Sequence, residues 1–134
     1  MSNYVADLLK SCDICLIQEH WLLTEHLGAL NLSDDFLPVG VSDMDSHELI
    51  LGRPYGGCGI LYHRSLAPNI VRLKCDTKHF CAILLITHCS RSCLRTLIVN
   101  VYLPTDYGTP DSNSEFLECL SELDGFFAAQ SFEI

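Results

Sequence analysis

The feature that most constrains the fold is a short apolar run that ends on a carboxylate. Residues 13–21 read DICLIQEHW, and the apolar part, residues 14–17, is continuous instead of alternating with polar residues. A continuous run of this length predicts a strand buried on both faces. Open α/β sheets bind their ligands at the carboxyl ends of strands, which is where Glu19 falls. Glu19 is therefore a candidate functional residue, although on this run alone a solvated carboxylate after a strand is the simpler explanation.

The composition is that of one globular domain. The chain has 134 residues, of which 49% are hydrophobic and 19% are charged, enough for one core and too few for two comfortable domains. No apolar stretch is long enough to cross a bilayer, since the run around residues 82–87 is only strand-sized, and the first residues lack the pattern of a signal peptide. We therefore expect an intracellular protein that is not secreted and has no membrane partner, in the nucleus or the cytoplasm.

The net charge and the cysteines restrict the kinds of ligand. A net charge of -9 argues against tight, non-specific binding to nucleic acid, because phosphate contacts need Lys and Arg, but it leaves room for an enzyme that uses a divalent cation. Eight cysteines without a secretory signal predict free thiols in a reducing compartment. Cys12 with Cys15, and Cys89 with Cys93 near His88, make a zinc site conceivable, but no second clean motif completes it.

Periodicity and turn residues predict the order of the elements. Helices are expected over residues 4–10, over 21–28 with Gly28 closing the helix, and from a cap at Ser114 through Phe127. Strands are expected over residues 14–18, 36–41, 70–74, 80–87 and 94–102, with a hairpin turn over 88–92.

A glycine-dense loop precedes one further strand. Residues 52–63 read GRPYGGCGILYH, and three glycines in four positions allow a close backbone approach or a tight turn. The loop does not fit a phosphate loop, because no Gly-Lys-Ser/Thr follows and a strand, not a helix, comes next. A turn with a bulge and a ligand role remain equally good interpretations.

Three motifs in this order resemble the endonuclease/exonuclease/phosphatase superfamily, and most closely the endonuclease domain of LINE-type (non-LTR) retrotransposons. The motifs are IQEHWL at residues 17–22, GRPYGGCGIL at 52–61 and NVYLP at 100–104. The resemblance implies an α/β (α+β) chain with the four-layered α/β sandwich of the DNase I-like fold. It also implies hydrolysis of phosphodiester bonds, with DNA as the partner.

The resemblance assigns roles to a few residues. Glu19 matches the glutamate that holds the catalytic Mg²⁺, and Tyr102 matches the tyrosine that hydrogen-bonds the scissile phosphate. Asn100 resembles a positioning residue of the same motif. Arg53 and Tyr55 fall where a loop could touch the DNA backbone, although a solvated loop explains them more simply. His20 is not fixed in the family, and an exposed histidine at a helix start is its simpler interpretation.

The departures from the family pattern limit what the resemblance implies. Thr105 stands where related nucleases often have Asn, and the 134 residues contain neither a Gly-Asp-x-Asn nor a Ser-Asp-His motif. The early strand with an Asn at the metal site is also missing. We therefore expect residues 1–134 to form the N-terminal half of the domain, to bind Mg²⁺ weakly through one carboxylate, and to be inactive as they stand.

Two alternatives remain open. The fold could serve as a non-catalytic interaction module whose half-core is completed by a partner chain or by the missing second half, and the negative charge favours this over DNA binding. The chain could also be a phosphoesterase of the same superfamily that acts on small substrates, although Trp21 and the glycine loop favour the retrotransposon type.

Overall fold

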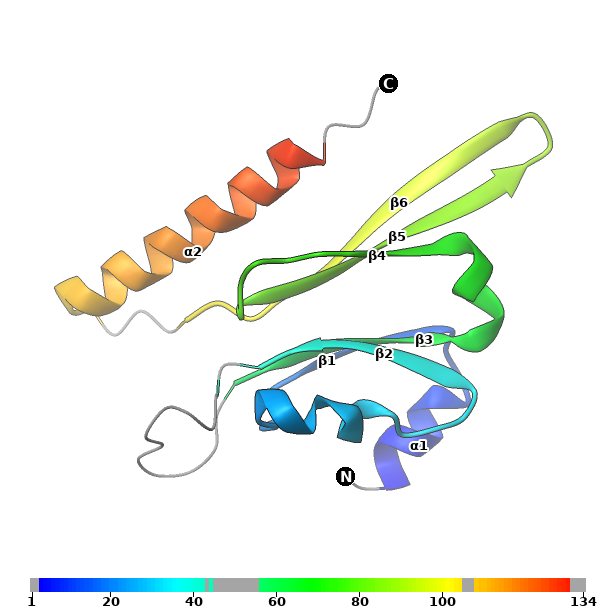
Figure 1. Ribbon diagram of the computed structural model, residues 1–134, viewed down its shortest axis with the longest axis horizontal. Coiled ribbons are helices and arrows are strands. Elements are labelled where there is room, and N and C mark those ends of the chain that lie inside the picture. The colour runs from blue at the N-terminus through cyan, green and yellow to red at the C-terminus, as the bar shows by residue number, and fades with distance from the viewer. Residues whose placement is uncertain (1–2, 43, 45–55, 105–107, 131–134) are drawn as a thin grey trace.

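The structure is a computed structural model that describes residues 3–42, 44, 56–104 and 108–130. It is a mixed α+β fold with two three-stranded antiparallel sheets and a long C-terminal helix, as Figure 1 shows. The helical elements are α1 (Asn3–Leu9), the 3-10 helices η1 (Thr24–Leu30) and η2 (Arg64–Asn69), and α2 (Pro110–Ala129). The strands are β1 (Ile14–Gln18), β2 (Phe36–Val41), β3 (Cys58–His63), β4 (Ile70–Leu73), β5 (Phe80–Cys89) and β6 (Ser92–Val101).

The first sheet has the strand order β1-β3-β2, with both neighbours of β3 antiparallel to it. The prediction that β1 is buried on both faces is wrong, because Leu16 is 47% exposed. In the described part of the chain β1 lies at an edge of the sheet, so only one of its sides is paired. The inference from open parallel sheets therefore does not apply to Glu19, and other observations must place it.

The second sheet has the order β4-β5-β6, also fully antiparallel. The predicted hairpin is confirmed, but its strands are longer than expected. They pair from Phe80 with Val101 as far as Cys89 with Ser92, so the turn shrinks to Ser90 and Arg91. Backbone pairing thus extends into a segment whose polar side chains predicted a loop.

The two sheets face each other across the main core. Cys58, Ile60 and Tyr62 of β3 pack with Cys81 and Ile83 of β5, and all five are at most 3% exposed. Alternate residues of a strand point to one face, so this set defines the inner face of each sheet. Burial of apolar area between the sheets is the main stabilising contribution, at about 25 cal/mol per Å².

Helical elements cover the outer face of the first sheet. Leu9 of α1 and Leu30 of η1 pack on Phe36 and Leu61, and Figure 1 shows α1 and η1 on the side of this sheet that is turned away from the second sheet. The predicted helix after Trp21 is confirmed only in part, because η1 begins later and continues past Gly28 to Leu30. No helix among the described residues is long and apolar enough to span a membrane.

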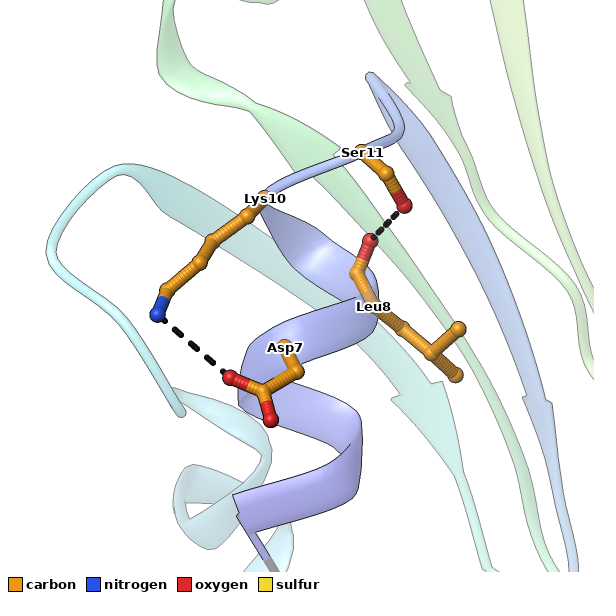
Figure 2. Close-up of polar contacts among 4 residues, drawn as sticks. All are labelled: Asp7, Leu8, Lys10 and Ser11. Atoms are coloured by element: carbon orange, nitrogen blue, oxygen red, sulfur yellow. Dashed lines mark hydrogen bonds and ion pairs between the residues drawn. The ribbon is translucent and has the colours of Figure 1, made fainter.

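Helix α1 ends in a small network of local polar contacts (Figure 2). The Ser11 hydroxyl donates to the Leu8 carbonyl oxygen at 2.9 Å, which satisfies one of the last carbonyl groups of the helix. Lys10 Nζ lies 3.4 Å from Asp7 Oδ1. Both charged side chains are exposed, so the ion pair contributes little to stability.

Helix α2 begins earlier than the expected cap at Ser114. Its N-cap is Thr109, which forms a capping box with Ser112, and Pro110 opens the first turn. The helix contacts the second sheet through the rings of Phe126 and Phe80, whose centroids lie 5.2 Å apart. The Thr77 hydroxyl also donates to Glu122 Oε2 at 3.0 Å.

Replacing Thr109 by alanine is expected to destabilise α2 by about 1 kcal/mol, because Thr109 Oγ1 accepts from the Ser112 backbone N–H at 3.2 Å. Ser114→Ala is the matched control, since Ser114 is an exposed hydroxyl residue beyond the first turn. Urea unfolding followed by circular dichroism measures both. Equal midpoints for the two variants would contradict this assignment of the cap.

Candidate functional site

The Glu19 and Tyr102 side chains meet at one end of the two sheets. The Tyr102 phenol donates to Glu19 Oε1 at 2.6 Å, although the residues lie 83 positions apart in the sequence. Glu19 follows β1 of the first sheet and Tyr102 follows β6 of the second. Two residues that the sequence assigned to one site are thus brought together, and the contact is short enough for a charge-assisted hydrogen bond.

The backbone that carries Glu19 adopts an unusual conformation. Glu19 and Trp21 have φ angles of 55° and 59°, a left-handed region that costs a side-chain-bearing residue about 1 kcal/mol or more. Their backbone N–H groups donate to Gly57 at 2.7 Å and to Gly56 at 3.1 Å. These bonds fix the segment against the start of β3 and direct Glu19 toward solvent.

His20 is a half-buried structural residue, so the expectation of an exposed histidine is wrong. Its Nδ1 accepts from the Leu22 backbone N–H at 3.0 Å, which assigns the ring proton to Nε2 and makes Nε2 the donor to the Val41 carbonyl oxygen at 2.7 Å. The ring also lies against Gly57, and a Cβ atom added to Gly57 would lie only 2.7 Å from Nδ1 of His20. Both ring nitrogens are therefore occupied, and His20 braces the segment.

Asn100 lies beneath the site and connects the two sheets. It is 3% exposed, and its Nδ2 donates to the carbonyl oxygens of Ile17 and Gly59, both at 2.8 Å. Gln18 Nε2 approaches Asn100 Oδ1 at 3.3 Å and donates to the Val101 carbonyl oxygen at 2.7 Å. The Asn100 amide therefore holds the ends of β1, β3 and β6 together.

The described residues do not provide a complete Mg²⁺ site. Mg²⁺ in proteins is held by one or two carboxylates with substrate phosphates and several waters. Glu19 supplies one carboxylate, and one of its oxygens accepts from Tyr102. No group of three or more His, Cys, Asp or Glu in the described segments could hold a metal. This donor set fits weak binding of one cation at most.

The cysteines of the β5–β6 hairpin do not support the zinc interpretation. Cys89 pairs with Ser92, and His88 pairs with Cys93 in the adjacent position of the hairpin. The two cysteines therefore point to opposite faces of the strands. Within the described ranges no arrangement of thiols and imidazoles provides the four ligands of a structural zinc site.

The structure does not describe the two residues that were predicted to contact DNA. Arg53 and Tyr55 fall outside the described residues. A groove of about 540 Å³ runs between the η1–β2 region and the residue 76–79 loop, and Glu19 and Tyr102 are not among its lining residues. Sequence reasoning missed Gln18 and Gly57 as parts of the site. The signal for Gln18 was its place as the last residue of the strand, directly before Glu19, and the signal for Gly57 was the glycine cluster.

Comparison of the chain with family models, curated proteins and solved structures found no match. No family is shown. The resemblance to the nuclease superfamily therefore rests on the three sequence motifs.

Proposed function

We propose that this chain is part of an endonuclease/exonuclease/phosphatase domain of the LINE-type retrotransposon kind. The inherited activity of such a domain is Mg²⁺-dependent hydrolysis of phosphodiester bonds in DNA. The observation that carries the proposal is the 2.6 Å hydrogen bond from Tyr102 to Glu19. If the motifs that contain Glu19 and Tyr102 matched the family only by chance, these two side chains would not be expected to contact each other.

The arrangement of the elements supports the same proposal. Two facing sheets, with α1 and η1 outside the first sheet and α2 beside the second (Figure 1), agree with one half of a four-layered α/β sandwich. The glycine motif contacts the same residues, because the Gly57 carbonyl oxygen accepts the Glu19 backbone N–H at 2.7 Å. All three motifs of the resemblance therefore contribute described residues to one cluster.

The chemistry of the cluster is incomplete in these 134 residues. Tyr102 has a single O–H to donate, and in the structure it donates to Glu19. Donation to a phosphate oxygen requires that this bond first break. The His–Asp pair and the Gly-Asp-x-Asn residues of the family are absent from the sequence. General acid–base groups contribute about 10²–10⁴-fold in rate and a preorganised donor about 10²–10³-fold, so their loss removes most of the catalysis.

The purified 134-residue chain is therefore expected not to nick supercoiled plasmid above the background rate in Mg²⁺. Glu19→Ala is the matched variant, because Glu19 is exposed and its removal leaves the core intact. The measurement is the rate of conversion to open-circular plasmid for both proteins, at matched concentration and with a nuclease as positive control. Nicking by the unaltered chain that Glu19→Ala abolishes would contradict the expected inactivity.

The family assignment has a separate test. The coding sequence on either side of this reading frame is expected to encode Gly-Asp-x-Asn, then Ser-Asp-His, then a reverse transcriptase. A chain extended to include these two motifs and the missing early strand with its Asn should nick plasmid in Mg²⁺, and Glu19→Ala or Tyr102→Phe should abolish the nicking. Flanking sequence without these motifs would overturn the nuclease proposal.

A non-catalytic interaction module is the second candidate, and the exposed apolar side chains favour it. Val71 of β4 and Leu94 of β6 are 45% and 59% exposed, and Leu117 and Phe127 of α2 are 54% and 46% exposed. Val71 and Leu94 lie on opposite faces of the second sheet, so exposed apolar side chains occur on both faces of this sheet and on α2, where another segment could pack against them. Flanking sequence that lacks the nuclease motifs would favour this module.

A further inference from the structure

Two buried thiols face each other across the main core. Cys58 Sγ lies 3.9 Å from Cys81 Sγ, and the two residues are 0% and 2% exposed. Cys58 belongs to β3 of the first sheet and Cys81 to β5 of the second. The contact therefore joins the sheets at a point where no backbone hydrogen-bond ladder connects them.

We propose that Cys58 and Cys81 form an oxidation site, at which a two-electron oxidant of the peroxide class links the two sheets by a disulfide. Bonded sulfurs lie about 2 Å apart, so the two atoms must approach each other by about 2 Å. Rotation about the Cα–Cβ bonds and a small shift of one sheet supply this movement.

The reaction balances with one peroxide for each pair. One thiol loses its proton and attacks the peroxide, whose O–O bond breaks, so that a sulfenic acid and water form. The second thiol loses its proton and attacks the sulfenic sulfur, the S–S bond forms, and the S–O bond breaks to release a second water. The two thiols supply the two electrons that reduce the peroxide.

The geometry selects this pair over its neighbours. Cys89 and Cys93 are exposed, but they lie on opposite faces of the hairpin and cannot join to each other within one chain. Cys75 lies near both buried thiols, and its Sγ donates to the Leu73 carbonyl oxygen at 3.7 Å. Cys58 and Cys81 already have their sulfurs in contact, which gives the pair the advantage of proximity.

The same environment makes the oxidation slow. The hydrogen bond with Cys58 and burial together raise the pKa of the Cys81 thiol, and the thiolate is the form that attacks. In the closed sandwich the pair is therefore protonated and shielded from solvent. Crosslinking should depend on opening of the sheet interface, and its rate should rise with pH and with urea below the unfolding midpoint.

The crosslink would act directly on the candidate site. The Cys58 thiol lies 3.4 Å from the Asn100 carbonyl oxygen and donates to it, and Cys58 follows Gly57, which accepts the Glu19 backbone N–H. A disulfide removes the thiol proton and ties this part of β3 to β5. The pair is therefore a point at which oxidation reaches the backbone that holds Glu19.

The test is disulfide mapping of the full chain. Reduced protein is incubated with hydrogen peroxide in sub-denaturing urea, unreacted thiols are alkylated at acid pH, and the chain is digested with trypsin and a glutamyl endopeptidase. Cuts after Glu48, Lys74 and Lys78 separate Cys58, Cys75 and Cys81 into different peptides. The expected product joins the Cys58 and Cys81 peptides, is cleaved by dithiothreitol, and unfolds roughly 10 °C higher than the reduced protein.

Matched variants decide the assignment. Cys58→Ser and Cys81→Ser should each lose the crosslinked peptide and the rise in unfolding temperature, whereas Cys75→Ser, Cys89→Ser and Cys12→Ser should keep both. Pairing of Cys58 or Cys81 with Cys75 would overturn the proposal. It would also be overturned if Cys58 and Cys81 of the unaltered chain remained fully alkylatable after the incubation with peroxide.

Discussion

Replacing Gly57 by alanine is expected to destabilise the fold by about 3 kcal/mol or more, the range of a strained backbone combined with a steric clash. Gly57 has a φ of 92°, which a residue with a side chain rarely adopts. An added Cβ would also collide with the His20 ring. The ring cannot move aside without loss, because both of its nitrogens are hydrogen-bonded. Urea unfolding followed by circular dichroism measures the change.

Gly125→Ala is the matched control. Gly125 lies within α2, and a Cβ added there meets nothing within 4 Å. Alanine is favoured over glycine in a helix interior by up to about 1 kcal/mol, so this variant should be as stable as the unaltered chain or more stable. A second check combines Gly57→Ala with His20→Ala, where removal of the ring should recover part of the loss. Unchanged stability of Gly57→Ala would contradict the close packing of His20 on Gly57.

Several strands and the first helix could be predicted from local sequence signals. The expected strand over residues 36–41 is β2 (Phe36–Val41), and the expected helix over residues 4–10 is α1 (Asn3–Leu9). Both segments combine a clear apolar pattern with flanking turn residues. The hairpin of β5 and β6 was found for the same reason, although its strands continue further into the polar turn.

The errors arose where tertiary contacts decide the outcome. The continuous apolar run of β1 predicted full burial, but β1 has a paired neighbour only in β3 among the described strands, and Leu16 is exposed.

The error at the start of α2 has a different cause, because Thr109 and Pro110 gave a local signal that outweighs Ser114. That error was avoidable, because a threonine cap followed directly by proline is a stronger sequence signal than serine alone.

The candidate site could be predicted only through the motifs. Nothing in the periodicity of residues 14–21 or 94–102 requires that Glu19 and Tyr102 meet, since the contact depends on how the two sheets face each other. The resemblance gave each of the two residues a role at one site but predicted no contact between them, and the structure joins them by a hydrogen bond of 2.6 Å. The bracing role of His20 was out of reach, because it depends on two main-chain partners, Leu22 and Val41, that only the folded chain brings to the ring.

Replacing Asn100 by alanine is expected to cost about 3 kcal/mol, because two buried carbonyl groups lose their donor and a cavity forms. The Asn100 amide is the donor to Ile17 and Gly59 at 2.8 Å, and so links the first sheet to β6 of the second. Asn113→Ala is the matched control, since Asn113 is exposed on α2 and its loss should change stability by less than about 0.5 kcal/mol. Urea midpoints of the two variants give the comparison.

Asn100→Asp separates a hydrogen-bonding role from simple filling of space. The aspartate has nearly the shape of asparagine but no N–H donors, and its carboxylate would face the two carbonyl oxygens of Ile17 and Gly59. Burial and these oxygens would hold the pKa of that carboxyl above its usual value, so the folded state would bind a proton that the unfolded state releases. Stability of the variant should then fall as pH rises from the usual carboxyl pKa to the raised pKa of the folded state, and recover below the usual carboxyl pKa. A variant as stable as the unaltered chain at neutral pH would mean that the two sheets are held at this end by apolar packing, and that Glu19 and Tyr102 do not depend on Asn100 for their positions.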